Sequence, residues 1–251
     1  MIHLKSGQEI QIMQESGKRL REVMLELVPM VQAGVTTQAI DDEAERLILK
    51  NGGTPSFKTV KGYKWSTCVP INEQVVHTPP SERILKDKDI LTIDIGLVYK
   101  GYHTDHAITL YVGDIETNQA MKRFFEVGKS ALKKGIEKAI NGNYLGEISQ
   151  VIQNEVYGSG CFVLKDLTGH GIGKELHEDP YVFNYLERPV KKTYKIQPGL
   201  VIAIEVIYSM GTEEIAYEKK GEWSIKTKDD SLSACFEHTV AVTEENTYIL
   251  T

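Results

Sequence analysis

The stretch 89-DILTIDIGLVY-99, followed closely by 103-HTDHAITLYV-112, is rich in β-branched and aromatic residues and predicts two successive strands. Apolar residues at helical spacing predict helices over about 6–31, which opens with the capping box Ser6–Glu9, and from about 37 to 51. Helices follow at about 117–141 and 146–157, and strands at about 200–208 and 233–242. This order of helices then strands, twice, predicts an α+β fold with an antiparallel β core flanked by helices.

Composition limits the class of protein. The chain has 251 residues, 41% hydrophobic and 25% charged, with no low-complexity linker, so we expect one domain over residues 1–251. A net charge of -6 argues against binding nucleic acid through phosphate neutralisation. The longest aliphatic run, Leu200–Ile204, is too short to span a membrane, and no signal peptide is evident. The widely spaced Cys68, Cys161 and Cys235 argue against a disulfide framework, so we expect a cytoplasmic protein.

A weak internal repeat relates the second helix of each half. At an offset of 108 residues, small and apolar positions of the first half match small and apolar positions of the second: Gly34, Ile40, Ala44, Ile48 and Gly52 match Gly142, Ile148, Ile152, Val156 and Gly160. Because all amphipathic helices share one period, these five matches alone do not distinguish duplication from coincidence.

Four carboxylates lie within strand-like runs where carboxylates are unusual. Asp94 and Glu205 interrupt apolar stretches, and strand alternation places Asp105 and Glu237 among small or polar neighbours. A buried carboxylate without a partner is costly and takes up a proton. No lysine or arginine lies in these runs, so two divalent metal ions would balance the four charges directly.

The segment 169-GHGIGKELHEDP-180 contains two histidines seven residues apart. Gly169, Gly171 and Gly173 allow close approach of the backbone, which would aim His170 into a site. The spacing differs from the H-E-x-x-H pattern of helical zinc peptidases, so that class is excluded.

These residues form a candidate set of metal ligands: Asp94, Asp105, His170, Glu205 and Glu237. Oxygen ligands with one imidazole and no thiolate suit Mn, Fe(II), Co or Zn. Two such ions ~3.5–4 Å apart can activate a water molecule for hydrolysis. The ligand types do not specify which bond is hydrolysed.

The ordered set of motifs resembles the type I methionine aminopeptidases, which have the pita-bread fold. The resemblance covers nearly the whole chain and rests on Asp94 and Asp105 at their spacing, on 169-GHGIG-173 with 177-HEDP-180, on Glu205, and on 227-TKDDSLSACFEHT-239. It implies two halves related by pseudo-twofold symmetry. It also implies removal of the initiator methionine from nascent polypeptides, at the ribosome, preferably when the second residue is small. Nothing in the sequence demands more than a monomer.

The resemblance also implies roles for the metal ligands. Asp94 would bind one metal ion, Asp105 and Glu237 would bridge both, and His170 and Glu205 would complete the other. Glu205 would in addition carry a proton from the attacking water to the leaving amine.

Further residues would contact the substrate or a second kind of ion. His177 would stabilise the developing oxyanion, and His77, in 72-NEQVVHTPP-80, would contact the same peptide bond from the other side. The methionine pocket would be formed by Tyr63, Cys68, Leu176 and Trp223. Asn72 and Ser233 match positions that help to hold a structural monovalent cation.

Three positions depart from the usual family pattern. Thr78-Pro79-Pro80 stands where Gly-Ile-Pro is usual, Val206 replaces a proline, and Leu176 replaces an aromatic residue. These departures leave the metal ligands intact and bear on substrate selectivity.

Three alternatives remain. A Xaa-Pro aminopeptidase or prolidase shares the fold and the ligands, but usually has an additional N-terminal domain, whereas about 90 residues precede Asp94 here. A pita-bread binding module without catalysis would typically have lost ligands that this chain retains. A type II methionine aminopeptidase has a large insertion in its second half, where only 34 residues separate His170 from Glu205.

Overall fold

A computed structural model describes residues 2–218 and 223–251 and confirms the α+β class. The helices are α1 (Gly7–Leu27), α2 (Thr37–Lys50), α3 (Gln119–Lys138) and α4 (Leu145–Gly158). The strands are β1 (Thr54–Pro55), β2 (Thr67–Cys68), β3 (Ile90–Tyr99), β4 (Tyr102–Tyr111), β5 (Phe162–Val163), β6 (Thr168–Gly171), β7 (Glu178–Phe183), β8 (Val201–Ser209), β9 (Ile215–Tyr217), β10 (Ile225–Thr227), β11 (Ser233–Val242) and β12 (Thr247–Ile249). Short 3₁₀ segments are Val28–Met30, Phe57–Thr59, Ile115–Thr117 and Val190–Lys192.

The first helix begins as predicted and ends earlier. Ser6 Oγ accepts a hydrogen bond from the Glu9 backbone, and the Glu9 carboxylate accepts one from the Ser6 backbone, so the capping box is confirmed. The α-helix ends at Leu27 rather than near residue 31, because Pro29 has no backbone N–H to continue the ladder and the chain tightens into a 3₁₀ turn.

The internal repeat is confirmed by backbone geometry. Helices α2 and α4 have 14 residues each and begin at positions 108 residues apart. Gly34 and Gly142, which precede them, have φ of 96° and 92°, and Gly52 and Gly160, which follow them, have φ of 72° and 78°. These left-handed positions favour glycine, so the matched glycines reflect a repeated chain path rather than the helical period alone.

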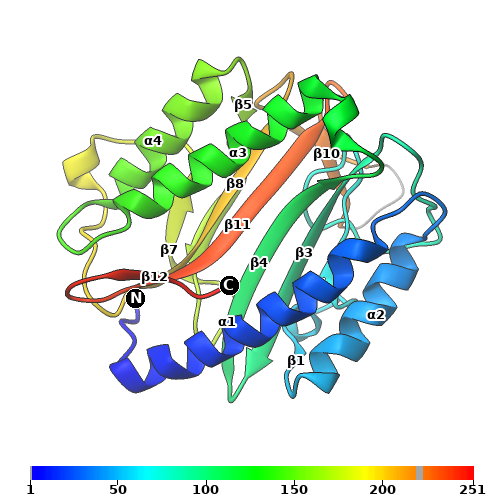
Figure 1. Ribbon diagram of the computed structural model, residues 1–251. Coiled ribbons are helices and arrows are strands. Elements are labelled where there is room, and N and C mark those ends of the chain that lie inside the picture. The colour runs from blue at the N-terminus through cyan, green and yellow to red at the C-terminus, as the bar shows by residue number, and fades with distance from the viewer. Residues whose placement is uncertain (1, 219–222) are drawn as a thin grey trace.

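The two halves meet at the centre of the molecule, where β4 and β11 lie side by side (Figure 1). Strand β3 pairs antiparallel with β4 in one sheet, and β8 pairs antiparallel with β11 in the other. Threonine side chains join the sheets: Thr109 Oγ1 bonds to the backbone N and O of Cys235, and Thr239 Oγ1 bonds to those of Asp105, all at 2.9 Å. The reciprocal pattern matches the pseudo-twofold relation of the halves.

Alternation along the strands separates core from site. Figure 1 shows α1 and α2 beside β3 and β4, and α3 and α4 over β8 and β11. Side chains facing the helices are apolar and buried: Leu91, Ile93, Ile95 and Leu97 of β3, and Ile202, Ile204, Val206 and Tyr208 of β8. Burying them against the helices stabilises each half by the hydrophobic effect. The alternate positions carry the acidic residues to the opposite face.

Two further expectations bear on the class of protein. The cysteines Cys68, Cys161 and Cys235 are buried free thiols. Within residues 2–218 and 223–251, none of the helices combines the length and apolarity needed to cross a lipid bilayer.

Candidate active site

Five strands each contribute one of the predicted metal ligands to a single cavity of about 420 Å³. The contributions are Asp94 from β3, Asp105 from β4, His170 from β6, Glu205 from β8 and Glu237 from β11. Asp105, His170 and Glu237 are buried, while Asp94 and Glu205 are half-buried. The structure therefore brings together all five residues.

The ligand atoms lie close enough for a cation to bind between them. One ligand atom from each of Asp105, His170 and Glu237 lies within 4.8 Å of the other two. His170 Nε2 is 3.2 Å from Glu205 Oε1, and Glu205 is the direct cross-strand partner of Glu237. Like charges in directly opposed strand positions are destabilising, so this pairing needs positive charge nearby.

Buried carboxylate atoms in this cluster have unused ligand capacity. Asp94 Oδ1 and Glu237 Oε1 are buried and have no hydrogen-bond partner in the described parts of the chain. Burial, together with neighbouring carboxylates, raises the pKa of Asp94, Asp105 and Glu237 well above the usual range. Carboxylates that favour a bound proton in this way also favour a bound cation in its place. Their oxygen atoms are donors that fit divalent metal ions.

His170 presents its outer nitrogen to the same cluster. Its Nδ1 lies 2.9 Å from the Gly171 carbonyl oxygen, which fixes the ring so that Nε2 faces Glu205 Oε1 at 3.2 Å. Burial lowers the pKa of His170, but the hydrogen bond and charge of Glu205 outweigh this effect and raise it. The backbone can approach because Gly169 lacks a Cβ, which would lie 2.4 Å from the Ala203 carbonyl oxygen.

The other two predicted histidines line the same cavity. The His177 ring makes an edge contact with the His170 ring, with centroids 4.5 Å apart. Burial first, and nearby histidines second, lower the pKa of His177 to about 3. Burial likewise lowers the pKa of His77, whose backbone has the left-handed φ of 59°, a sparsely populated conformation that is often found at functional sites. Both imidazoles are therefore neutral at neutral pH.

All four residues predicted for the methionine pocket lie on the cavity wall: Tyr63, Cys68, Leu176 and Trp223. Tyr63 and Trp223 form an edge-to-face pair with ring centroids 5.3 Å apart. The Tyr63 hydroxyl donates to the Thr67 carbonyl oxygen at 2.7 Å, which fixes the ring against β2. The four side chains belong to one hydrophobic cluster, an apolar and aromatic part of the wall that we call the apolar end of the cavity.

Sequence reasoning missed several wall residues: Phe57, Val60, Val76, Asp166, Leu167, Thr168, Tyr181 and Ile207. Ile207 and Thr168 lie two positions from Glu205 and His170, so strand alternation could have placed them on the same face. Phe57 and Tyr181 come from segments with no such periodic relation to a ligand, and no sequence signal points to them.

The three departures from the family pattern occupy different places. Leu176 lines the cavity and is buried. Val206 is fully buried on the opposite face of β8, in the core beneath α3 and α4, so it does not contact the site. Thr78 and the two prolines after it line a separate cavity of about 460 Å³, which shares Trp223 with the active site. Leu176 is therefore the departure that touches the site directly.

Asn72 and Ser233, the residues predicted to hold a monovalent cation, are adjacent. The Ser233 backbone N donates to the Asn72 carbonyl oxygen at 2.9 Å, and Ser233 Oγ donates to the Gln74 carbonyl oxygen at 2.7 Å. Asn72 itself has a left-handed φ of 58°. The cation remains a prediction.

Known proteins resemble this chain along its whole length. Residues 11–244 match metallopeptidase family M24. Methionine aminopeptidase 1 of Bacillus subtilis is 39% identical over 251 residues, covering 100% of this chain and 99% of the relative. A methionine aminopeptidase of Clostridium perfringens is 41% identical with the same coverage. The crystal structure of a Thermotoga maritima methionine aminopeptidase has a TM-score of 0.95 at 35% identity and covers 100% of this chain and 99% of that one.

Prolidases share the fold at lower similarity. The prolidase of Pyrococcus furiosus has a TM-score of 0.78 at 22% identity, and the match covers 65% of that chain. The pita-bread architecture is thus confirmed, while sequence identity separates the methionine-specific enzymes from the prolidase alternative. The chain belongs to metallopeptidase family M24 and, within it, to the methionine aminopeptidases.

Proposed function

We propose that this aminopeptidase removes methionine from nascent chains with two divalent ions held by Asp94, Asp105, His170, Glu205 and Glu237. The observation that carries the proposal is the convergence of these residues, with uncompensated buried oxygens, on one cavity. The ligand types suit Mn, Fe(II), Co or Zn. When bound, such ions supply an activated water nucleophile near neutral pH and polarise the scissile carbonyl.

The chain's own residues would manage protons and orientation. Glu205, which lines the cavity and is half-buried, accepts a proton from the attacking water and returns it to the leaving amine. His177 is neutral, since its pKa is about 3, and so can donate an N–H to the developing oxyanion. His77 contacts the same peptide bond as a second neutral imidazole.

The apolar end of the cavity would hold the methionine side chain. A thioether offers no strong hydrogen bond, so it is selected by shape, apolar contact and sulfur–aromatic contact with Tyr63, Trp223 and Phe57. The preference for a small second residue rests on the resemblance to type I enzymes.

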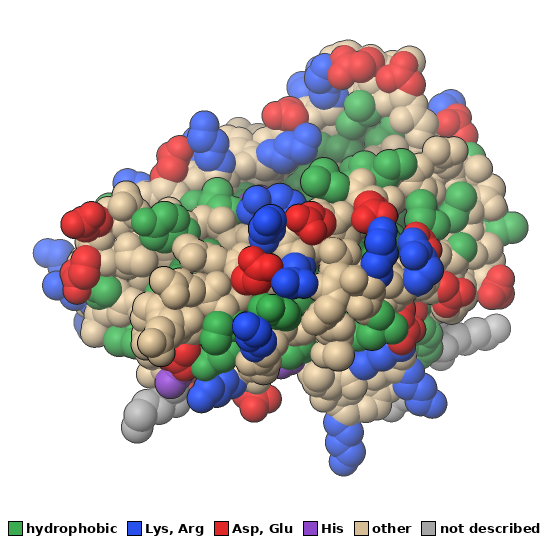
Figure 2. Space-filling model, turned by 60° about the horizontal axis from the view of Figure 1, so that its bottom comes forward, with side chains coloured by type: hydrophobic (Ala, Val, Ile, Leu, Met, Phe, Trp, Pro, Cys, Tyr) green, Lys and Arg blue, Asp and Glu red, His purple; other side chains and the backbone are tan. Residues whose placement is uncertain are grey.

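The same proposal covers partners and location. We infer that the enzyme acts in the cytoplasm, as a monomer, on chains emerging from the ribosome. We also infer that it does not bind nucleic acids specifically. Figure 2 supports the last point, since lysine and arginine side chains are interspersed with aspartate and glutamate on the face shown. The net charge of -6 points the same way.

Peptide cleavage after metal exchange tests the proposal. Chelator-treated protein is supplied with Mn, Co, Fe(II) or Zn in turn and assayed with Met-Ala-Ser and with Ala-Pro-Phe. We expect release of methionine from the first peptide, restored by metal, and no cleavage of the second. Two bound ions per chain at full activity support the dinuclear site, whereas full activity with one ion contradicts it.

The protein's own N-terminus provides a first prediction. Ile2 is large and β-branched, and it packs against the core cluster around α3 and α4. An enzyme that needs a small second residue should leave Met1 in place when the protein is produced without a tag. Intact-mass measurement decides the matter, and a mass short by one methionine contradicts the proposed specificity.

Leu176→Phe provides a second prediction. Leu176 lines the cavity at a position where the family pattern implied by the resemblance has an aromatic residue, so an aromatic ring there would add a sulfur–aromatic contact of ~0.3–1.5 kcal/mol. The ratio of kcat/KM for methionine- and norleucine-initiated tripeptides should rise by roughly 2–10-fold, the equivalent of that energy, with metal content unchanged. An unchanged ratio in a well-folded variant shows that residue 176 does not contact the methionine side chain.

A further inference from the structure

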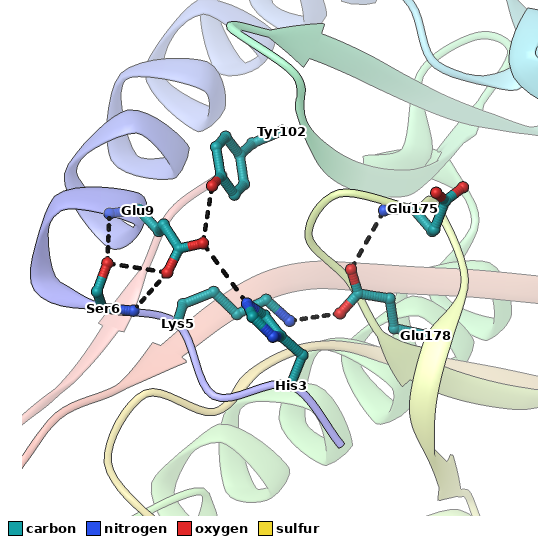
Figure 3. Close-up of polar contacts among 7 residues, drawn as sticks. All are labelled: His3, Lys5, Ser6, Glu9, Tyr102, Glu175 and Glu178. Atoms are coloured by element: carbon teal, nitrogen blue, oxygen red, sulfur yellow. Dashed lines mark hydrogen bonds and ion pairs between the residues drawn. The ribbon is translucent and has the colours of Figure 1, made fainter. Parts of the chain in front are cut away.

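A buried lysine near the N-terminus reaches the segment that carries His177. The Lys5 side chain is 1% exposed, and its Nζ lies 2.6 Å from Glu178 Oε2 (Figure 3). Glu178 directly follows His177 in the chain. A buried charge is tolerated only when it is paired, so Lys5 and Glu178 depend on each other.

The segment in question, residues 172–178, is called the His177 loop below. Its first part is held by main-chain bonds: Ile172 N donates to Val201 O at 3.2 Å, and Gly173 O accepts from His103 N at 2.7 Å. Its last part is held by the Glu178 carboxylate, whose Oε1 accepts from the Glu175 backbone at 3.2 Å. One oxygen of Glu178 thus ties the loop to itself, and the other ties it to Lys5.

Gly173 makes room for this arrangement. A Cβ at position 173 would lie 2.4 Å from Lys5 Cε and 2.8 Å from Glu178 Oε1. The third glycine of the motif therefore admits the lysine side chain, whereas the first two allow backbone approach around His170. The sequence-based expectation that all three glycines aim His170 is incomplete in this respect.

Lys5 is itself held in place from both sides. Its backbone N donates to the Gly199 carbonyl oxygen at 2.7 Å. The next residue, Ser6, caps α1 through Glu9, and Glu9 also accepts from the Tyr102 hydroxyl at 2.7 Å (Figure 3). These bonds, led by that from the Ser6 backbone, lower the pKa of Glu9 to about 2, so the carboxylate stays charged. The lysine extends from a fixed anchor rather than from a loose terminus.

We propose that Lys5 is a positioning residue: through Glu178 it holds the His177 loop so that His177 meets the scissile amide. The inference rests on the role proposed above for His177. A buried ion pair often adds little net stability relative to apolar residues of similar size. A contribution to stability alone therefore does not explain well why a lysine, rather than an apolar residue, is buried beside this loop.

The test is a double-mutant cycle between Lys5→Met and His177→Ala, with kcat and KM measured on Met-Ala-Ser at full metal occupancy. Methionine keeps the length of the lysine stem and removes the charge. We expect Lys5→Met to lower kcat by roughly 10–100-fold, the scale of a misplaced catalytic contact, with little change in KM. In the His177→Ala background the same substitution should change kcat by less than about twofold, because coupled residues are not additive.

Two more variants keep the test decisive. Ser6→Ala removes the side-chain cap of α1 in the same segment but leaves the ion pair, the Lys5 backbone bond to Gly199 and the Ser6 backbone bond to Glu9, so its kcat should match that of the parent protein. If Lys5→Met does not fold, the double variant Lys5→Met with Glu178→Gln takes its place, since it removes both charges of the pair and the amide oxygen still accepts from the Glu175 backbone.

The outcomes are distinct. Equal losses from Lys5→Met in both backgrounds, or no loss in either, overturn the positioning role. If His177→Ala retains full activity, the role proposed for His177 is wrong and the positioning role falls with it. Metal-dependent release of methionine by the parent protein is measured in the same series, so failure of the inference is separated from failure of the proposed function.

Discussion

Glu205→Gln should lower kcat for methionine release by at least ~100-fold, the scale of general acid–base catalysis, while the fold and the metal content are retained. Glutamine keeps an oxygen that can bind a cation or accept from His170, whose Nε2 lies 3.2 Å from Glu205 Oε1. It cannot take up and return a proton. The measurement is kcat on Met-Ala-Ser, with bound metal quantified in the same sample.

Glu205→Asp is the matched variant. It keeps a titratable carboxylate one methylene shorter, so it should retain more activity than the glutamine variant. Near-parental turnover by Glu205→Gln at full metal occupancy would show that another group moves the proton. Loss of metal from Glu205→Gln would instead show that the residue is needed to bind metal, and the Glu205→Asp variant at full occupancy would then carry the test of proton transfer.

Replacing Asp105 should harm the enzyme when metal is limiting and stabilise the protein when metal is removed. Asp105→Asn should weaken metal binding and lower activity at limiting metal by more than ~100-fold, beyond the 10–100-fold typical of changes outside the ligand shell. The same substitution should raise the melting temperature of chelator-treated protein at pH 8. Asp105 helps to raise the pKa of Glu237, and a neutral asparagine relieves that repulsion. Asparagine also keeps the acceptor for the His106 backbone at 3.0 Å.

The stability that Asp105→Asn gains in chelator-treated protein should depend on pH, in a direction set by the raised pKa values of the carboxylates. The pKa values of Asp94, Asp105 and Glu237 are raised by folding, chiefly through burial. The stability that such groups contribute is present below their unfolded pKa of about 4 and is lost as the pH rises through the folded values. The advantage of asparagine in chelated protein should therefore grow between pH 5 and pH 8.

Thermal unfolding of both proteins, with chelator and with saturating metal, checks these statements. Each kcal/mol of relieved repulsion corresponds to roughly 2–4 °C for a chain of this size. Metal should stabilise the parent protein more than the variant, because it binds the folded parent more tightly. The charge of Asp105 also helps to raise the pKa of His170, so loss of that favourable interaction offsets part of the gain from relieved repulsion. A chelated variant less stable than the parent at pH 8 would mean that Asp105 is held by structural contacts that outweigh repulsion.

Local patterns in the sequence determined the elements of this protein and the chemistry of its site. Period-two alternation placed Asp105 and Glu237 on the face opposite the helix-packed core, and helical period placed α2 and α4 within two residues of their observed bounds. Five acidic and histidine positions predicted the ligand set, and all five line one cavity. These properties depend on near neighbours in the chain, so the sequence alone contains them.

Only the tertiary structure decided which surfaces meet. Alternation assigns a residue to a face of its strand but does not say which strand lies opposite, so the threonine bonds between β4 and β11 were not predictable. Nor could the sequence say which of its three departures from the family pattern lies in the site. In the structure Leu176 alone reaches the site directly, while Val206 packs in the core. Lys5 and Glu178 lie 173 residues apart, and no local period relates them. Their contact exists because folding the two halves together places the start of the chain beneath the His177 loop, where burial makes each charge require the other.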